Sequence, residues 1–408
     1  MSTKSPYELS EKTITTVKST VPVLAEHGEA ITTHFYKRMF ADHPELKNIF
    51  NMTNQKAGRQ PRALANAVYA AAQHIDDLSA ILPTVNQIAE KHRSLQVKPE
   101  HYPIVGKYLL IAIKEVLGDA ATDDIMQAWE EAYGAIAHAF IQVEEKKYEQ
   151  AVAQDGGWSG YRNFKIAKKV KESAVITSFY LEPEDGKKIT SYHPGQYITV
   201  QINMPHSEYT HLRQYSLSDA PGKGYYRISV KREEGGPERP DGVVSSYLHD
   251  QLEEGAVLPI TAPAGDFYLN EENHEPLVLI SGGVGLTPMM SMLNRMVHQN
   301  HDRDVYFVHA AHNQEVHAFK EEVADFVKES PSVQAKVVYS TPGAEDSAYD
   351  REGRIDLPWL KSVVPYDAEF YFCGPEGFMR EVHSSLKEWG VPDEQIHYEF
   401  FGPELSLQ

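Results

Sequence analysis

Apolar side chains recur every three to four positions from residue 8 to about residue 148. This spacing is typical of amphipathic helices whose apolar face is buried. Prolines and one glycine divide the pattern into several segments, because both residue types end or interrupt helices. The dividing residues are Pro44, Pro61, Pro83, Pro99 and Gly118. The pattern predicts an all-α domain over residues 1–150.

The pattern changes after Gly156 and Gly157. Apolar and polar positions now alternate in short runs such as Tyr197–Ile202 and Tyr226–Lys231, and Gly/Pro turns separate the runs. A period of two indicates half-buried strands. We predict a small antiparallel β-barrel over residues 157–272.

The last third begins with the apolar strand Leu277–Ser281, a glycine-rich turn and the helix-like run Met289–Met296. Strand-like segments return at Val305–His309 and Glu369–Cys373. Alternating strands and helices are typical of a doubly wound parallel sheet. The expected fold class is therefore multidomain: an all-α domain, an antiparallel β-barrel, and an α/β doubly wound domain over residues 273–408.

Composition narrows the possible partners and the cell compartment. The chain has 408 residues, enough for two or three domains, and a formal net charge of −19. An acidic surface repels phosphate backbones, so we expect no nucleic acid partner, although a local arginine or a helix N-terminus can still hold a dinucleotide. Cys373 is the one cysteine, which excludes an intramolecular disulfide and a thiolate metal cluster. No signal peptide and no run of about 20 apolar residues is evident, so we expect a cytoplasmic protein without membrane insertion.

One histidine of the helical domain lies where a core residue is expected. Ile81, Val85, Ile88 and His92 follow a spacing of four, three and four, so they share one helix face. The simplest interpretation is a hydrogen-bonded core histidine. A neutral imidazole is also a common iron ligand, so the residues alone leave both interpretations open.

A carboxylate in a later helix bears on this choice. Trp129, Tyr133, Ile136 and Phe140 form an apolar stripe, and Glu144 extends the stripe by one turn at the expected end of that helix. Glu144 is either a solvated residue of a helix end or the partner of a buried group. A metal-bound imidazole needs an acceptor for its other N–H, and Glu144 suits this role.

Several runs of the helical domain resemble the globin motifs of bacterial flavohaemoglobins. They are His34–Phe40, Asn48–Phe50, Gln60–Leu64, Lys91-His92 and His101-Tyr102. The similarity continues through the later motifs to the carboxyl terminus and covers essentially all 408 residues.

This resemblance implies a role for each matching residue of the globin part. His92 is the expected proximal haem ligand and the metal-binding residue, with Tyr102 and Glu144 orienting it. On the distal side the resemblance places Tyr36, Gln60 and Leu64, while Phe50 packs on haem and Lys91 influences its redox behaviour. Core packing is an equal alternative for Tyr36, and it is the simpler interpretation of Leu64. Pro61 places Gln60 at a helix start or a kink.

The second domain resembles the ferredoxin-NADP reductase superfamily. The run Arg213–Ser216 opens a predicted β segment. The resemblance implies that its arginine binds a pyrophosphate and that its tyrosine and serine contact the flavin ring. The residues expected to bind FAD in this domain are Tyr197, Arg213, Gln214, Tyr215, Ser216, Gly242, Val243, Val244 and Ser245.

The third domain has a glycine turn between its first strand and first helix. Glycines at such a turn let a dinucleotide approach the backbone, and the helix N-terminus favours its phosphates. The turn is not the usual Gly-x-Gly-x-x-Gly fingerprint, and a simple tight turn is the alternative. The residues expected to bind NAD(P)H here are Gly282, Gly283, Val284, Gly285, Leu286 and Thr287.

Two further segments complete the resemblance. Cys373, Gly374 and Pro375 follow a strand and correspond to a segment beside the nicotinamide, where the buried thiol positions and does not react. The closing segment corresponds to residues at the flavin, with Phe401 covering the ring and Glu399 influencing redox behaviour; core packing is the alternative for its phenylalanines. This segment comprises Glu399, Phe400, Phe401, Gly402 and Pro403.

The resemblance implies a nitric oxide dioxygenase with haem b, FAD and NAD(P)H as cofactors, in which nitric oxide and oxygen give nitrate. We expect a monomer. Two alternatives remain: a haem-based oxygen or redox sensor, and a ferric, flavin or quinone reductase with incidental haem. The residues do not decide between NADH and NADPH.

Overall fold

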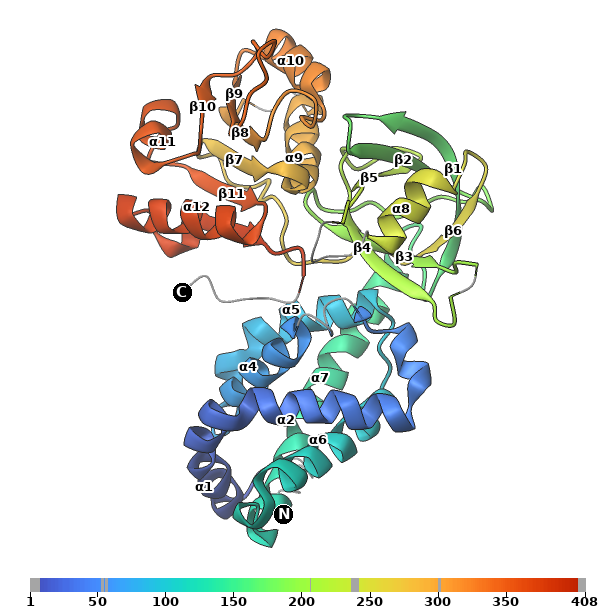
Figure 1. Ribbon diagram of the computed structural model, residues 1–408, viewed down its shortest axis with the longest axis vertical. Helices are drawn as coiled ribbons and strands as arrows, with labels where there is room; N and C mark the ends of the chain where they lie inside the picture. Colours follow the sequence, from blue (N-terminus) through green and yellow to red (C-terminus); the bar gives the residue numbers. More distant parts are fainter. Residues whose placement is uncertain are drawn as a thin grey trace. The chain divides into compact units, whose positions relative to one another are not determined.

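The computed structural model describes residues 8–52, 55, 58–205, 207–235, 242–299 and 302–402 (Figure 1). The chain forms two compact units. One comprises the residues up to Gln154 together with Asn203–Leu212, and the other comprises Asp155–Ile202 and Arg213–Gln408. The first is helical, and the second contains two six-stranded sheets.

The first unit is built from α-helices with short 3₁₀ turns between them. The described elements are α1 (Glu11–Ser19), α2 (Val21–Asp42), η1 (Pro44–Asn48), α4 (Arg59–Gln73), η2 (Leu78–Ile81), α5 (Leu82–Ser94), α6 (His101–Leu117), η3 (Gly118–Ala120) and α7 (Asp123–Ala153). Side chains begin some of them: Ser10 Oγ accepts from the Thr13 N–H at α1, and Thr122 does the same for Ile125 at α7. The core of this unit is apolar, and its largest fully buried side chains include Phe35, Tyr108 and Met39.

The predicted interruptions of the helical pattern are helix starts and ends. Pro44, Pro61 and Pro83 lie in the first turns of η1, α4 and α5, where the missing N–H has no helical acceptor to lose. Gly118 ends α6 with a φ of 55°. Helix α7 runs on to Ala153, which corrects the expected helical limit near residue 148.

The first sheet of the second unit is antiparallel. Its strands are β1 (Arg162–Lys171), β2 (Ile176–Pro183), β3 (Tyr197–Ile202), β4 (His211–Ser216), β5 (Tyr226–Lys231) and β6 (Val257–Ile260), in the order β4-β3-β6-β1-β2-β5. An isolated antiparallel bridge between Leu217 and Ile228 joins the two ends of this order, so the sheet closes on itself. Helix α8 (Val243–Asp250) lies between β5 and β6 in the chain.

The second sheet is parallel, with the order β10-β9-β8-β7-β11-β12. Its elements are β7 (Leu277–Gly282), η4 (Gly283–Gly285), α9 (Leu286–His298), β8 (Val305–Ala311), α10 (Lys320–Glu329), β9 (Val333–Tyr339), β10 (Arg351–Glu352), α11 (Leu357–Val363), β11 (Glu369–Cys373), α12 (Glu376–Trp389), η5 (Asp393–Gln395) and β12 (Ile396–Glu399). Helices cover both faces. One core joins α9 and α10 to the sheet, and the other joins α11 and α12 to the opposite face.

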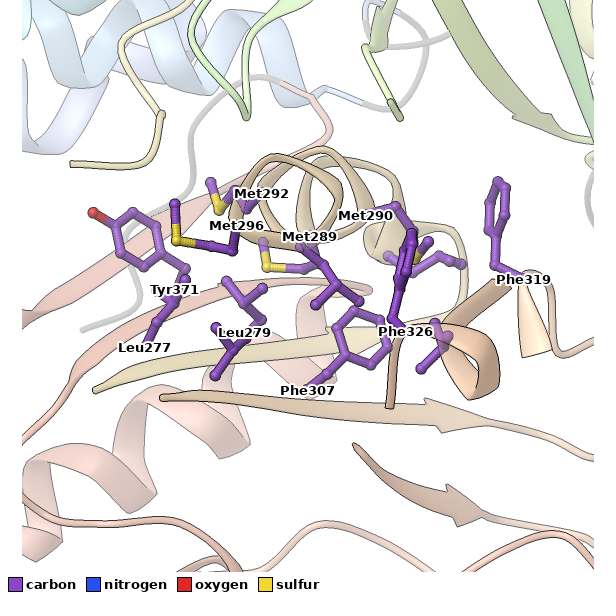
Figure 2. Close-up of a cluster of buried hydrophobic side chains, with 14 of the residues drawn as sticks. Leu277, Leu279, Met289, Met290, Met292, Met296, Phe307, Phe319, Phe326 and Tyr371 are labelled. Atoms are coloured by element: carbon purple, nitrogen blue, oxygen red, sulfur yellow. The ribbon is translucent and has the colours of Figure 1, made fainter. Parts of the chain in front are cut away.

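Helix α9 packs on the sheet through methionines. Met289 and Met296 lie over Leu279 and Tyr371 of β7 and β11 (Figure 2). Ten of the 13 residues of this helix are buried, so it has almost no solvent face. The predicted order of an all-α, an antiparallel and a doubly wound parallel fold is confirmed.

Candidate functional site

His92 lies in the last turn of α5, and Glu144 lies in α7, which packs against α5. The Nδ1 atom of His92 is 2.6 Å from Oε1 of Glu144 and 3.2 Å from the hydroxyl of Tyr102. Two neighbours compete for one ring nitrogen, and the shorter contact goes to the charged carboxylate. Glu144 is therefore the main hydrogen-bond acceptor for the N–H at Nδ1.

Tyr102 and Glu144 form the rest of this cluster. Tyr102 lies in the first turn of α6 and donates its hydroxyl to Glu144 Oε1 at 2.5 Å, while the Tyr133 hydroxyl donates to the Tyr102 carbonyl at 2.6 Å. Burial first, and then the charge of Glu144, raise the pKa of Tyr102 far above its ordinary value. Tyr102 is thus a neutral donor at any physiological pH.

The sequence pattern predicted Glu144 at the end of its helix, and this prediction is wrong. Helix α7 continues nine residues further to Ala153, and the Glu144 side chain is only 3% exposed. A carboxylate buried this deeply requires partners, and here they are His92 and Tyr102.

These residues fit an iron ligand. Because Nδ1 is engaged, Nε2 is the ring nitrogen left for a metal, and no described residue hydrogen-bonds to it. The His92 side chain is 32% exposed, and its ring lies 6.0 Å from that of Phe140. An imidazole held by a carboxylate at one nitrogen is the usual geometry of a metal-ligating histidine.

A second cluster surrounds Tyr36 of α2. The centre of its ring lies 5.8 Å from that of Phe40 and 5.6 Å from that of Phe50. Its hydroxyl interacts with the side-chain amides of Gln55 and Gln60. Burial raises the pKa of Tyr36, and the two amides oppose this shift. The hydroxyl is therefore a buried neutral donor with amides beside it.

The other residues expected in the globin part occupy ordinary positions. Gln60 is the second residue of α4, so Pro61 marks a helix start and not a kink. Leu64 packs on the edge of the core, and Lys91 is half-buried in α5. The sequence interpretation missed Gln55, whose side-chain amide lies beside the Tyr36 hydroxyl. No local pattern marks this residue, since its position beside Tyr36 depends on tertiary packing.

The expected FAD residues lie on β3, β4 and α8. Arg213–Ser216 ends β4 and does not open a strand, which corrects the sequence interpretation. Arg213 and Tyr215 are half-buried on this strand, Gln214 is exposed and Ser216 is buried. Burial lowers the pKa of Arg213.

Tyr197, at the start of β3, packs against Gly265. A Cβ atom on Gly265 would lie 2.9 Å from the Tyr197 ring, and the φ of this glycine is +115°. Gly265 thus permits the close approach of the aromatic ring.

The run Gly242–Ser245 forms the start of α8. Gly242 caps the helix, and Ser245 Oγ donates to the Gly242 carbonyl at 2.9 Å and accepts from the Glu233 N–H at 3.1 Å. Val243 is exposed and Val244 is buried. Such a helix N-terminus offers free N–H groups to an anion.

The glycine turn after β7 is tightly packed against the end of β11. A Cβ atom on Gly285 would lie 2.2 Å from the Cys373 carbonyl oxygen, and one on Gly374 would lie 3.2 Å from the Gly282 nitrogen. Gly283 alone in this turn has a positive φ, 54°. The glycines are needed because two backbone turns meet here.

The rest of this turn begins α9. Val284 is half-buried in η4, Leu286 is the buried first residue of α9, and the Thr287 hydroxyl donates to the Val284 carbonyl at 3.1 Å.

These two turns lie at the topological switch point of the parallel sheet. From β7 the chain moves outward through β8, β9 and β10 on one side, then returns to β11 and β12 on the other. Both turns follow the carboxyl ends of their strands, with Ser281 opposite Cys373. In doubly wound sheets, ligands bind at this position.

Cys373 is fully buried, and Pro375 caps α12. Burial, with a smaller effect of Glu399, raises the pKa of the thiol well above its ordinary range, so a nucleophilic thiolate is disfavoured.

In the closing segment, Glu399 is buried, Phe400 packs on the core beside α12, and Phe401 is 47% exposed. Core packing therefore explains Phe400 and not Phe401. Gly402 has an unusual φ of 154°, and Pro403 lies outside the described residues.

Three family models match the chain. They are the globin family over residues 33–140, the oxidoreductase FAD-binding domain over 163–268 and the oxidoreductase NAD-binding domain over 279–384. The chain is 59% identical to the flavohemoprotein of Halalkalibacterium halodurans over 403 residues, which cover 98% of both chains. It is 60% identical to one from Bacillus cereus over 404 residues, covering 98% of this chain and all of the relative. The chain belongs to the flavohemoprotein family.

Solved structures agree with this assignment. The flavohemoglobin from Malassezia yamatoensis with bound FAD and heme has a TM-score of 0.84 at 31% identity, and covers 97% of this chain and 100% of its own. The FAD/NAD-binding domain of nitric oxide dioxygenase from Vibrio cholerae has a TM-score of 0.55 at 41% identity, over 59% of this chain and 99% of its own. The three domain matches confirm haem, FAD and a nicotinamide dinucleotide as cofactors of an oxidoreductase. In the part of the chain that the structure describes, no helix is long and apolar enough to cross a membrane.

Proposed function

We propose that this flavohemoprotein is an NAD(P)H-dependent nitric oxide dioxygenase, which converts nitric oxide and oxygen to nitrate. The observation that supports this most directly is the 2.6 Å contact between His92 Nδ1 and the buried carboxylate of Glu144. A carboxylate partner makes an imidazole a stronger electron donor, which favours oxygen activation over reversible oxygen binding.

The cofactors supply the redox chemistry: two-electron hydride donation from NAD(P)H, its division into single electrons at FAD, and oxygen chemistry at haem iron. The chain's own residues bind and orient. His92 would hold the iron through Nε2, while Glu144 accepts the hydrogen bond from the N–H at Nδ1 and Tyr102 donates its hydroxyl to the same carboxylate. Tyr36 provides a neutral hydroxyl donor that the amides of Gln55 and Gln60 hold in place.

The second unit positions the electron donors. The guanidinium of Arg213 and the N-terminus of α8 are suited to the pyrophosphate of FAD, since one pairs bidentately and the other presents free N–H groups. The turn Gly282–Gly285 and the N-terminus of α9 are suited to the phosphates of the dinucleotide. Phe401, exposed at the carboxyl end of β12, is the proposed cover of the flavin ring. A cytoplasmic location and a monomeric state are part of this proposal.

The test measures nitric oxide consumption, oxygen consumption and nitrate formation with NADH and with NADPH. One hydride carries two electrons, so each NAD(P)H should support two nitrates. A sensor would consume dinucleotide only until its haem is reduced, and a ferric or flavin reductase would form no nitrate; either result would refute the proposal.

Replacing His92 by alanine tests the assignment of the haem ligand. The variant should lose stable haem and nitrate formation while it keeps FAD and the reduction of FAD by NAD(P)H, because His92 and the flavin residues lie in different compact units. A full haem complement with an unchanged absorption spectrum would show that the ligand assignment is wrong.

A further inference from the structure

A buried arginine joins the antiparallel sheet to the helices of the parallel sheet within the second unit. Arg227 of β5 is only 3% exposed. Its Nη1 and Nη2 donate to Oε2 and Oε1 of Glu322 in α10 at 3.0 and 3.2 Å. The guanidinium also lies 4.8 Å from the centre of the Phe319 ring, next to the start of α10. This bidentate pair therefore links two domains that are far apart in the sequence.

The antiparallel sheet fixes the orientation of the arginine. Arg227 Nε donates to the Ser218 hydroxyl at 3.2 Å, and Nη2 also donates to the Ser218 carbonyl. The backbones of the same two residues are bonded, with Ser218 N donating to Arg227 O at 2.8 Å. The planar fork is thus set in one orientation before it reaches Glu322, which reduces the entropy lost on pairing.

Helix α9 completes the connection through two polar residues one turn apart. Asn294 Nδ2 donates to Glu322 Oε1 at 2.7 Å, and Ser291 Oγ donates to the Asp219 carbonyl at 2.7 Å. The Tyr192 hydroxyl donates to the same carbonyl at 2.6 Å. Met289 and Met296 of α9 pack on the parallel sheet (Figure 2), while Ser291 bonds directly to the antiparallel-sheet domain and Asn294 is connected to it through Glu322.

Charge is matched throughout this cluster. Glu322 and Asp219 raise the pKa of Arg227 above its ordinary value against the effect of burial. Burial opposes the ionisation of Asp219, but the charges of Arg227 and Lys223 and the hydrogen bonds from Lys223 and Tyr225 lower its pKa. Each buried charge therefore has a partner, which is the condition for an ionic contact in an interior to persist.

Adhesion between the domains does not require these charges. Buried ion pairs contribute little net stability, and apolar residues of similar size often replace them without loss. What a bidentate pair adds is a defined orientation. Here the oriented element is α9, whose first residue follows the glycine turn proposed to hold the dinucleotide.

We propose that Arg227 and Glu322, with Asn294 and Ser291, form an interdomain clamp that positions the nicotinamide for hydride transfer to the flavin. The proposal rests on the proposed NAD(P)H-dependent reductase activity. Hydride transfer moves one hydrogen nucleus and two electrons from the dihydronicotinamide to the flavin ring, and its rate depends steeply on the distance and angle between the two. These are positioning residues, and none of them is expected to touch either cofactor.

The test uses the full-length holoprotein and anaerobic stopped-flow reduction of FAD by NADH and by 4-deuterated NADH. The variants are Glu322→Gln, which keeps the shape and removes the charge, and Arg227→Met. Arg351→Met is the matched control, since it removes a bidentate pair with Asp356 (2.8 and 2.5 Å) that lies within the parallel-sheet domain.

For both clamp variants we expect the limiting rate of FAD reduction to fall about tenfold or more, because displacements of about 1 Å can have effects of this size. The deuterium isotope effect should rise as hydride transfer becomes fully rate-limiting. The FAD content, the flavin reduction potential and the Kd of NADH should stay within twofold of the parent. Arg351→Met should match the parent in every measurement.

Lower thermal stability with an unchanged reduction rate per bound FAD would show a structural role only and would overturn the proposal. If Arg227→Met fails to bind FAD, the milder Glu322→Gln decides. A parent protein whose FAD is not reduced by NADH or NADPH would refute the proposed function itself, which separates the two failures.

Discussion

Replacing Glu144 by glutamine tests the link between the buried carboxylate and the proposed iron ligand. The substitution keeps the size of the side chain and removes its charge. Oε1 of Glu144 accepts from His92 Nδ1 at 2.6 Å and from the Tyr102 hydroxyl at 2.5 Å. A neutral acceptor at the same place keeps both contacts but weakens them.

The magnitude follows from these two bonds. A hydrogen bond to a charged group contributes roughly 1.5–3 kcal/mol and a neutral one about 1 kcal/mol, so the variant should lose about 2 kcal/mol of stability in the helical unit. The new amide NH₂ adds a further cost of about 1 kcal/mol, because it enters a buried position where a carboxylate oxygen stood. Loss of a partner that tunes a metal ligand typically lowers activity about 10- to 100-fold.

The assay is resonance Raman spectroscopy of the ferrous haem, combined with nitric oxide turnover. The iron–histidine stretch should move to lower frequency, nitrate formation should slow, and haem and FAD should remain bound. Glu145→Gln is the matched control, since it makes the same change at the next, exposed position of α7. If Glu144→Gln has the stretching frequency and turnover of this control, the carboxylate does not tune the ligand and the reasoning is wrong.

Three further predictions concern the remaining parts of the chain. Gly285→Ala would place a Cβ atom 2.2 Å from a backbone carbonyl of the adjacent turn, so the KM for NADH should rise and the melting temperature should fall, whereas Gly377→Ala, with open space around its Cβ, should match the parent. Burial lowers the pKa of His317 to about 4, so the unfolded chain binds a proton here between about pH 6.5 and 4 and the folded chain does not. This residue should therefore cost about 3 kcal/mol of stability as pH falls through that window and nothing above it. The acid dependence of urea unfolding should be reduced by about one proton in His317→Gln, and an unchanged dependence would contradict the assignment. A fragment ending at Gln154 should bind haem and oxygen without consuming NAD(P)H, and sustained NAD(P)H-driven nitric oxide consumption by it would contradict the proposed electron path.

The fold class could be predicted from the sequence because each domain has its own periodicity. The limits of β3, β5 and β11 agree with the predicted runs, since alternating or continuous apolar residues between turns define strands well. The end of α7 was less predictable. Its last turns carry polar residues that do not distinguish a helix from a linker, so the sequence pattern places Glu144 at a helix end although it lies inside α7.

Some residues of the candidate sites could be predicted from the sequence and others could not. His92 and the glycine turn stand out in the sequence because a polar residue on an apolar face and glycines after a strand are local signals. Arg227 and Glu322 gave no such signal. They are 95 positions apart, and each looks like an ordinary charged residue until the two sheets are assembled. Gln55 was missed for the same reason.

The single thiol of the chain can be used to measure local opening of the parallel sheet. Cys373 ends β11 between β7 and β12, is fully buried, and has a pKa raised by burial. A thiol reagent can therefore label the native protein only while this sheet is locally open. The labelling rate of the unmodified protein thus measures how often the dinucleotide-binding domain opens, without interference from the helical unit, which contains no cysteine. Because that rate should slow when a nicotinamide dinucleotide is bound, one stoichiometric modification can follow the occupancy of this domain.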